Sequence, residues 1–333
     1  MWRLALRGRI ECHGVYAVTT FLVRRLLQAV PTLLLVSIIV FAIMRATPGD
    51  PARAALGNAF GVTDQVLATV RHQMGLDEPV YVQYLYWLGN VLHGDFGRSY
   101  MSKANVADLL EQSVPASFEL AFAASLLALV IALPAGVLIA VKRGSLLDQI
   151  VTALVTAGIA MPGFWLAMLL VILFAVLVPI LPPSGFVQFN DDPAGHVQRL
   201  ILPSVTLAIL VASPTMRFVR SSMLDVLGEE YLRSARAKGL GEWLVITRHA
   251  LKNALIPAVT WVGLQFAYLL ASSVMIEWVF GWPGVGALAV RSVLSRDYIV
   301  VQGTVIFAAA VFVVVNLMVD VLYVVLDPRV RQT

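Results

Sequence analysis

Six long apolar stretches, separated by more polar segments, constrain this chain more than any other feature. They cover roughly residues 26–44, 118–141, 149–178, 200–218, 254–280 and 302–326. As helices, all six are long enough to cross a hydrocarbon core about 30 Å thick. Of the 333 residues, 59% are hydrophobic and 13% are charged, whereas soluble domains carry about 25% charged residues. We therefore predict an all-α membrane protein with six transmembrane helices.

The apolar pattern also predicts how the chain is organised. Residues 1–20 form an N-terminal extension, 21–45 the first transmembrane helix, 46–117 a helical subdomain outside the membrane, and 118–216 helices two to four. Residues 217–253 form a polar loop, 254–326 helices five and six, and 327–333 a tail. Gly158, Pro162 and Gly163 predict a kink or a strong tilt in the long third stretch. Glycines and proline predict a re-entrant segment near 281–300.

The positions of lysine and arginine predict the orientation, because these residues accumulate in cytoplasmic loops. With six spans, the basic residues that flank the spans fall on one side: Arg24, Arg25, Lys142, Arg143, Arg217, Arg220, Arg233, Arg236, Lys238, Arg248, Lys252, Arg329 and Arg331. The loop over 46–117 on the opposite side carries seven acidic residues and four basic ones. We expect both termini in the cytoplasm and the 46–117 subdomain outside.

The 46–117 segment is too long for a bare connector. Pro48-Gly49-Asp50-Pro51 begins it with turn chemistry, and the spacing of apolar residues predicts a helix over Asp64–Met74. Tyrosines and a tryptophan over 81–87 favour a helix at the membrane interface. A packing cap on the bundle and a docking site for a partner remain equally open.

The polar loop contains a segment rich in small and basic residues, followed by Pro257 at the start of the fifth apolar stretch. Ser221–Lys238 is a plausible helix, Gly239-Leu240-Gly241 a break, and Glu242–Asn253 a second helix. Ala235, Ala237 and Gly239 permit close approach by a partner backbone, and Arg236 and Lys238 can pair with acidic groups on it. Physical chemistry alone leaves a second interpretation open, a basic loop attracted to anionic lipid.

The pattern Glu-Tyr-x-Arg-x-Ala-Arg-Ala-Lys-Gly over 230–239 resembles the cytoplasmic coupling loop of ABC-transporter permeases of the dipeptide/oligopeptide importer class. It departs from the general Glu-Ala-Ala pattern of ABC importers, since Arg233-Ser234-Ala235 stands there and Leu255-Ile256-Pro257 follows at a longer distance. Other segments are similar to the same subclass. They are Pro48–Pro51, Gly75–Pro79, Gly94–Gly97, Trp282–Gly286, Arg296–Tyr298 and Val319–Tyr323, and the resemblance covers about residues 21–331.

The resemblance implies a type I ABC importer permease fold in the bacterial inner membrane. It implies a second homologous permease, giving a heterodimer, two ATPase subunits that bind ATP and Mg, and an external substrate-binding protein. The loop residues that would dock on an ATPase are Glu230, Tyr231, Ala235, Arg236, Ala237, Lys238 and Gly239. The expected cargo is a di- or oligopeptide, carried by alternating access. Glutathione, nickel and oligosaccharide importers share this permease type, and a carrier working without an ATPase is a further alternative.

Polar and adaptable side chains inside the spans are candidates for the transport pathway or the permease interface. Asp320 costs about 2.5–3.5 kcal/mol at a span centre and should face protein, with Asn316 as a possible partner; polar packing near the span end is the competing interpretation. Met161, Phe164 and Trp165 follow the expected kink and could line a passage for varied side chains, or simply pack. Glu119 and Glu277 are expected to reach water. Trp282, Pro283, Gly284 and Gly286 are assigned to an external gate or re-entrant segment.

Motifs for bond chemistry are absent from the sequence. It contains no Gly-x4-Gly-Lys-Ser/Thr loop for nucleotide, no His-Glu-x-x-His and no Gly-x-Ser-x-Gly. The single cysteine, Cys12, excludes an internal disulfide and a cysteine-rich metal site. We therefore expect no catalytic residues, no metal, no cofactor and no nucleic-acid partner for this chain.

Overall fold

The computed structural model describes residues 2–46, 51–56 and 63–326. These ranges are helical or irregular, apart from an isolated antiparallel bridge between Arg98 and Asn105. Four helices among them are long and apolar enough to cross a membrane, and the number rises to six if each of two bent helix pairs is one span. The predicted all-α membrane fold is therefore confirmed, with two of the predicted spans broken.

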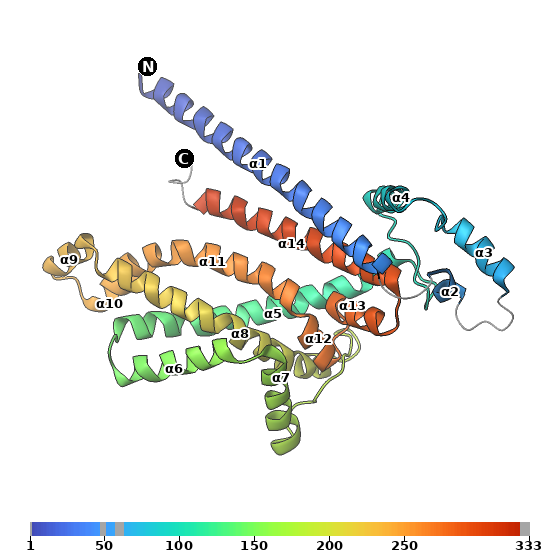
Figure 1. The fold of residues 1–333 in the computed structure, drawn as a ribbon. Coiled ribbons are helices and arrows are strands. Elements are labelled where there is room, and N and C mark those ends of the chain that lie inside the picture. The colour runs from blue at the N-terminus through green and yellow to red at the C-terminus, as the bar shows by residue number, and fades with distance from the viewer. Residues whose placement is uncertain (1, 47–50, 57–62, 327–333) are drawn as a thin grey trace.

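Five long helices run side by side through the molecule (Figure 1). They are α1 (Trp2–Ala46), α5 (Val106–Val141), α8 (Pro193–Leu227), α11 (Leu251–Ser272) and α14 (Tyr298–Leu326). Two helices extend beyond the predicted spans. Residues 2–20, predicted as an N-terminal extension, are helical and continuous with the rest of α1. Helix α5 begins at Val106 rather than at 118 because Val106 and Leu110 pack on Val300 in a small core beyond the predicted span.

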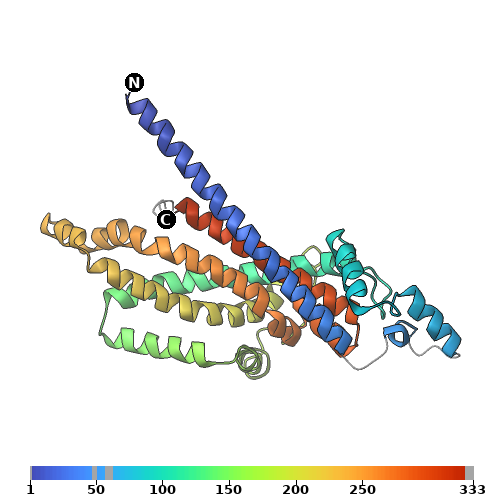
Figure 2. The same cartoon turned by 45° about the horizontal axis from the view of Figure 1, so that its top comes forward.

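The third apolar stretch forms two helices joined at a sharp bend. Helix α6 (Leu146–Ala160) is followed by α7 (Gly163–Val171) and a π-helical segment (Ile172–Leu177), and the two parts meet at 108°. Figure 2 looks down α7 while α6 lies across the view. Met161 is extended at the bend, as expected before a proline. The predicted kink is confirmed, but it is a break in the span. A bend of 53° likewise separates α11 from α12 (Val274–Phe280).

Alanine-rich faces allow α5 and α8 to pack closely in the main core. Ala121, Ala124, Ala128 and Ala132 of α5 are buried in the same cluster as Leu207, Ala208 and Ala212 of α8. Gly136 of α5 lies directly against Val219 of α8, so a Cβ there would come within 2.9 Å of that side chain. Small residues permit such close helix contact in membrane proteins. Helices α5 and α8 therefore form the centre of the bundle.

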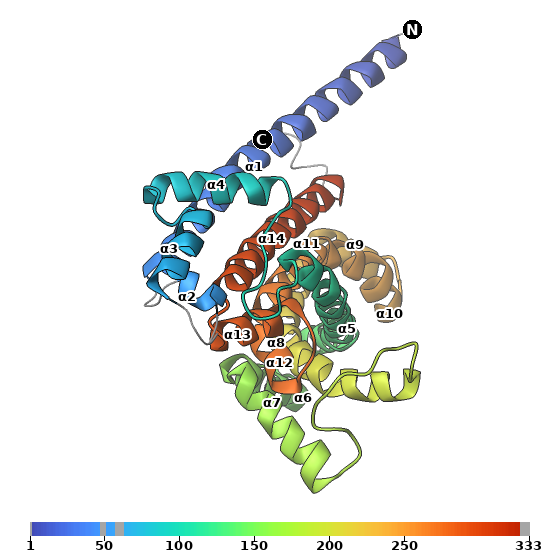
Figure 3. The ribbon, with the colours of Figure 1, turned by 90° about the vertical axis from the view of Figure 1, so that its right-hand side faces the viewer.

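The two ends of the bundle carry different structures (Figures 1 and 3). One end holds α2 (Pro51–Leu56), α3 (Asp64–Gln73), α4 (Val80–Leu92) and α13 (Val285–Leu294). The other end holds α9 (Glu230–Ala237), α10 (Glu242–Leu244) and a π-helical segment (Val245–Ala250). The predicted helix over 64–74 is confirmed by α3, whereas the turn at 48–50 and the tail over 327–333 lie outside the described residues.

Candidate functional site

Helix α9 is a short amphipathic element at the end of the bundle remote from α2–α4. The chain leaves α8 at Gly228, resumes as α9 at Glu230, and turns at Gly239 before α10. The sequence predicted one helix over Ser221–Lys238 and missed the break at Gly228. On the inner face, Leu232 is fully buried against a cluster that includes Val245 and Ile246. The inner face of α9 is therefore fixed by packing against the segment Val245–Ala250.

Two of the predicted docking residues make contacts within the chain. Ala235 is buried in the same cluster as Leu232, so its small side chain allows α9 to pack inward. Arg236 donates from Nε and Nη2 to the carboxylate of Glu242 at 3.0 and 2.8 Å. Its hydrogen bonds lower the pKa of Glu242, and the same pair raises the pKa of Arg236. Arg236 thus joins α9 to α10, and its predicted pairing with acidic groups of a partner stays a prediction.

The outward face of α9 retains the remaining predicted residues. Glu230, Ala237, Lys238 and Gly239 are all exposed. Gly239 has φ +81°, and an added Cβ would meet nothing within 4 Å. The left-handed backbone conformation explains why glycine stands at this position, where the sequence analysis had expected a helix break and close approach by a partner. Tyr231 is partly exposed, and its hydroxyl accepts from Asn253 Nδ2 at 2.7 Å, tying α9 to the start of α11.

Contacts between α8 and α11 continue from the base of α9 into the bundle. Ser222 Oγ donates to the carbonyl of Ala254 at 2.9 Å. One turn further along, Phe218 stacks on Trp261 with a centroid distance of 5.0 Å, and Trp261 Nε1 donates to Thr215 Oγ1 at 3.2 Å. Figure 2 shows α8 and α11 running together away from the α9 end. These contacts join α8 to α11 at successive levels along the two helices.

A partly buried ion pair attaches α6 to α8, and through α8 to α11. Arg220 of α8 donates from Nε and Nη2 to the two carboxylate oxygens of Asp148, both at 2.9 Å. Asp148 also accepts from Gly144 N and Thr152 Oγ1. The sequence analysis missed this pair, since it counted Arg220 only as a charge for orientation and did not consider Asp148. An acidic residue in the first turn of an apolar helix was the available signal.

The helices joined in this way border a cavity of about 550 Å³ at the α6–α7 bend. Its walls combine adaptable apolar groups with neutral hydrogen-bonding groups and include Met161, Phe164, Trp261, Gln265, Tyr268, Ser272 and Met275. None of its lining residues is charged. The sequence analysis identified Met161 and Phe164 but not the α11 residues. The cavity can accommodate a small molecule of variable polarity without an obligatory counter-charge.

The other predicted pathway residues lie elsewhere. Trp165 is 43% exposed on α7 and is not among the residues that line this cavity. Asp320 of α14 accepts from Arg25 Nε of α1 at 3.1 Å. Its partner is therefore Arg25 on the first helix, whereas the sequence analysis had suggested Asn316. This contact favours polar packing between α1 and α14, and a role of Asp320 in the pathway or the permease interface stays a prediction.

The Trp282–Gly286 segment turns α13 back against the bundle. Gly281 has φ +62° at the end of α12, and the fully buried Trp282 donates from Nε1 to the carbonyl of Ala116 at 2.8 Å. A Cβ on Gly284 would overlap the carboxylate of Glu277, and a Cβ on Gly286 would overlap the backbone of Val274. Pro283 lies next to Gly284 in this tight segment. The predicted fold-back of this segment is therefore present, and its glycines serve close packing.

Glu277 was wrongly expected to reach water, because it is fully buried. Its Oε1 accepts from Ser117 and Ser273 at 2.8 Å each, and its Oε2 accepts from the backbone N–H of Ala287 at 3.1 Å. A buried carboxylate is tolerated only with such donors. Glu277 therefore joins α5, α12 and α13.

Among the described residues, no group of three or more His, Cys, Asp or Glu side chains could hold a metal ion. The features with functional potential in this part of the chain are thus the outward face of α9, the joined helices α6, α8 and α11, and the cavity between them.

Comparison with known proteins assigns the chain to a family. Residues 132–332 match the family of binding-protein-dependent transport system inner membrane components, and residues 18–121 match the N-terminal region model of the same systems. A putative peptide transport system permease protein of Brucella abortus is 40% identical over 313 residues, covering 94% of this chain and 99% of that protein. The glutathione transport system permease protein GsiC of Escherichia coli K12 is 41% identical over 311 residues, covering 93% and 98%.

A solved structure supports the fold independently. An inward-facing form of the MetNI methionine ABC transporter contains a chain that superposes with a TM-score of 0.56 at 20% identity, covering 66% of this chain and 96% of that chain. Permeases of ABC importers work with separate ATPase and substrate-binding proteins and carry no cofactor. By its sequence and its fold, the chain belongs to the binding-protein-dependent transport system inner membrane components, as a non-catalytic, multi-pass permease of an ABC importer.

Proposed function

We propose that this permease imports di- or oligopeptides as one of two homologous subunits that enclose the pathway. A second permease fits because this chain alone does not enclose the Met161–Met275 cavity, and we propose that it is a homologous chain, giving a heterodimer. ATP binding and hydrolysis in two partner ATPases would displace α9, and the displacement would open and close the cavity alternately. The physical link from α9 to the cavity-lining helices carries this proposal.

That link consists of three kinds of contact at the α9 end. The Ser222–Ala254 hydrogen bond and the Phe218–Trp261 stack join α8 to α11, and the Arg220–Asp148 pair joins α8 to α6. Leu210 and Pro214 of α8 line the cavity together with residues of α6, α7, α11 and α12. Force applied at α9 therefore reaches several cavity walls through packed helices, without passing through a flexible loop.

The outward face of α9 supplies the docking surface in this proposal. Glu230 and Lys238 offer opposite charges, and Ala237 and Gly239 leave room for a partner backbone. The α9 end and both termini lie in the cytoplasm, in agreement with the distribution of lysine and arginine, and α2–α4 face the binding protein outside.

The cavity chemistry supports a peptide cargo. Methionine and aromatic side chains adapt to varied shapes, and Gln265, Tyr268 and Ser272 provide neutral groups for peptide amides. The uncharged wall does not select a cargo charge. Glutathione, itself a tripeptide, is the second candidate because a relative with 41% identity is named a glutathione permease. Nickel is less compatible, since the cavity lining has no charged or histidine ligand.

Transport by the reconstituted complex tests the proposal. Proteoliposomes containing both permeases and the ATPases, with the binding protein added outside, should accumulate labelled tripeptides only with ATP inside. Met161→Trp should reduce uptake by filling the cavity, while Met168→Trp on the exposed face of α7 should not. ATP-independent uptake would support a secondary carrier and contradict the proposal. Uptake of glutathione without other peptides would assign the second candidate.

A further inference from the structure

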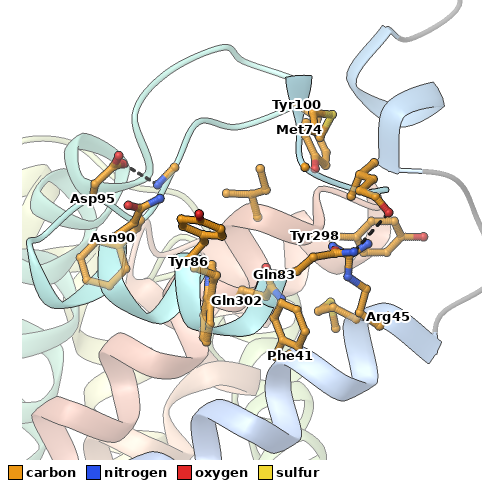
Figure 4. Close-up of a pocket in the computed structure, with 17 residues that line it drawn as sticks. Phe41, Arg45, Met74, Gln83, Tyr86, Asn90, Asp95, Tyr100, Tyr298 and Gln302 are labelled. Carbon is orange, nitrogen blue, oxygen red and sulfur yellow. Dashed lines mark hydrogen bonds between the residues drawn. The ribbon is translucent and has the colours of Figure 1, made fainter. Parts of the chain in front are cut away.

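A second cavity, of about 490 Å³, lies at the opposite end of the bundle from α9 (Figure 4). Three elements meet around it: the end of α1, one face of α4, and the start of α14. Phe41 and Arg45 come from α1, Gln83, Tyr86 and Asn90 from α4, and Tyr298 and Gln302 from α14. The proposed transport cavity shares no lining residue with this one.

The depth of this cavity follows from the contacts of α4 with α1. Tyr84 of α4 hydrogen bonds to Ser37 at 2.8 Å and packs edge-on against Phe41 at 5.5 Å. Both α1 residues lie inside the apolar span Arg24–Ala46, whose last turn carries Arg45. Ser37 lies eight residues before Arg45, or about 12 Å along the helix. Helix α4 therefore sits at the level of the lipid headgroups and the adjoining acyl chains.

The outer face of α4 is suited to that level. Tyr81, Leu85 and Leu92 are 68%, 63% and 77% exposed, and α4 has no charged side chain. An apolar helix face with interspersed aromatic rings is typical of the membrane interface. Tyr86, which is also exposed, connects this face to the cavity lining.

Inside the cavity, Arg45 is a cation with neutral contacts, and the lining also includes Asp95, whose Oδ1 accepts from the N–H of Gly97 at 2.8 Å. Arg45 donates to the side-chain oxygen of Gln83, and its guanidinium lies 5.5 Å from the centroid of Phe41. Among the described residues, no carboxylate forms an ion pair with it. Burial raises the pKa of Tyr100 to about 12, against an opposing effect of Arg45. Tyr100 therefore stays a neutral hydroxyl at the rim across physiological pH.

We propose that this cavity binds a phospholipid of the leaflet at the α2–α4 end, with Arg45 holding the phosphate. The glycerol region would lie against Tyr86 and Trp87, and the acyl chains would follow the exposed stripe of α4. Guanidinium matches phosphate oxygens in a bidentate manner. Such a lipid would stabilise the packing of α4 on α1, independently of the cargo and of the ATPases.

Native mass spectrometry of the full chain, purified with its accompanying subunits, tests the proposal. After delipidation, titration with phosphatidylglycerol should restore one bound lipid. Arg45→Gln should weaken this binding by about tenfold or more, as expected for loss of one charge-assisted hydrogen bond. Met74→Trp, which adds bulk to the wall and keeps Arg45, should also weaken it. Arg291→Gln, an exposed arginine on α13 that does not line the cavity, should not.

Two further probes distinguish the source of the ligand. Inorganic phosphate and glycerol phosphate should compete poorly, because they lack acyl chains. Equal competition by either would show an anion site and overturn the lipid assignment. Displacement of the lipid by a tripeptide would instead indicate a cargo site. Unchanged lipid binding in both Arg45→Gln and Met74→Trp would also overturn the proposal.

Discussion

Arg220 and Asp148, 72 residues apart in sequence, form a two-point ion pair that fastens α8 to the first turn of α6. Asp148 is buried, and its remaining acceptor positions are used by Gly144 and Thr152. The pair lies close to the α9 end of both helices, while the cavity lies further along them. Its position suits transmission of a movement from α9 to the α6–α7 bend.

Removing one member of this pair should uncouple the helices. Arg220→Gln leaves a buried carboxylate without its cation, which is more damaging than loss of the pair as a whole. We expect a lower thermal midpoint and a several-fold loss of ATP-driven uptake, with the double variant Asp148→Asn/Arg220→Gln recovering part of the midpoint. Arg217→Gln, an exposed arginine on the same helix, is the control. Equal midpoints for Arg220→Gln and Arg217→Gln would argue against the structural role of the pair.

Gly239 should tolerate asparagine better than alanine. Its φ of +81° lies in the left-handed region, where a non-glycine residue costs about 1–2 kcal/mol and asparagine is favoured among the alternatives. Space is not limiting, because no atom lies within 4 Å of an added Cβ. We expect co-purification with the ATPases to fall for Gly239→Ala and to be partly restored for Gly239→Asn. Gly241, at φ −62°, is the control, and Gly241→Ala should behave like the parent.

Acid should loosen the α9–α10 turn. The hydrogen bonds from Arg236, with their charge interaction, lower the folded-state pKa of Glu242. A lowered carboxyl pKa means that the stabilisation is complete above the unfolded-state value of about 4.3 and is lost as the pH falls through the folded-state value. Both side chains are partly exposed, so the effect is small and salt-sensitive. Between pH 5 and about pH 3, the thermal midpoint of the parent should fall further than that of Glu242→Gln. Parallel curves would contradict this.

How far the sequence predicted the molecule depends on the range of each interaction. Apolar runs and helix breakers act locally, so the spans, α3 and the fold-back after Trp282 were predictable. The break at Gly228 had a local signal in the glycine itself, but it was missed because an isolated glycine is tolerated inside a helix and the other residues of Ser221–Lys238 favour one. The start of α5 depended on distant contacts of Val106 with Val300, which no local pattern encodes.

Side-chain roles were the least predictable part. An alanine on an amphipathic helix can face a partner or its own core, and Ala235 faces the core only because Val245 and Ile246 lie beneath it. Arg25 and Asp320 lie at opposite ends of the sequence, and nothing in either neighbourhood indicates the other. The same holds for Glu277, whose donors come from three separate elements. The sequence predicted α9 as the docking helix but could not determine which of its side chains are exposed.

Gly284 should be among the least substitutable residues at the α13 end. A Cβ there would overlap the carboxylate of Glu277 and the hydroxyl of Ser117. Both groups are held in place, because Ser117 also accepts from the N–H of Val285 and Glu277 accepts from two further donors. Gly284→Ala should therefore displace α13 or break these hydrogen bonds, at a cost of about 1–3 kcal/mol.

Gly89→Ala in α4 is a matched control, since its Cβ would enter open space and helix propensity favours alanine by about 1 kcal/mol. The thermal midpoint of the purified protein should fall for Gly284→Ala and stay or rise for Gly89→Ala. In the double variant Gly284→Ala/Glu277→Gln, the loss of thermal midpoint should be smaller than the sum of the losses in the two single variants, because both changes disrupt one network. Additive losses would show that Gly284 and Glu277 act independently and that the network does not hold α13.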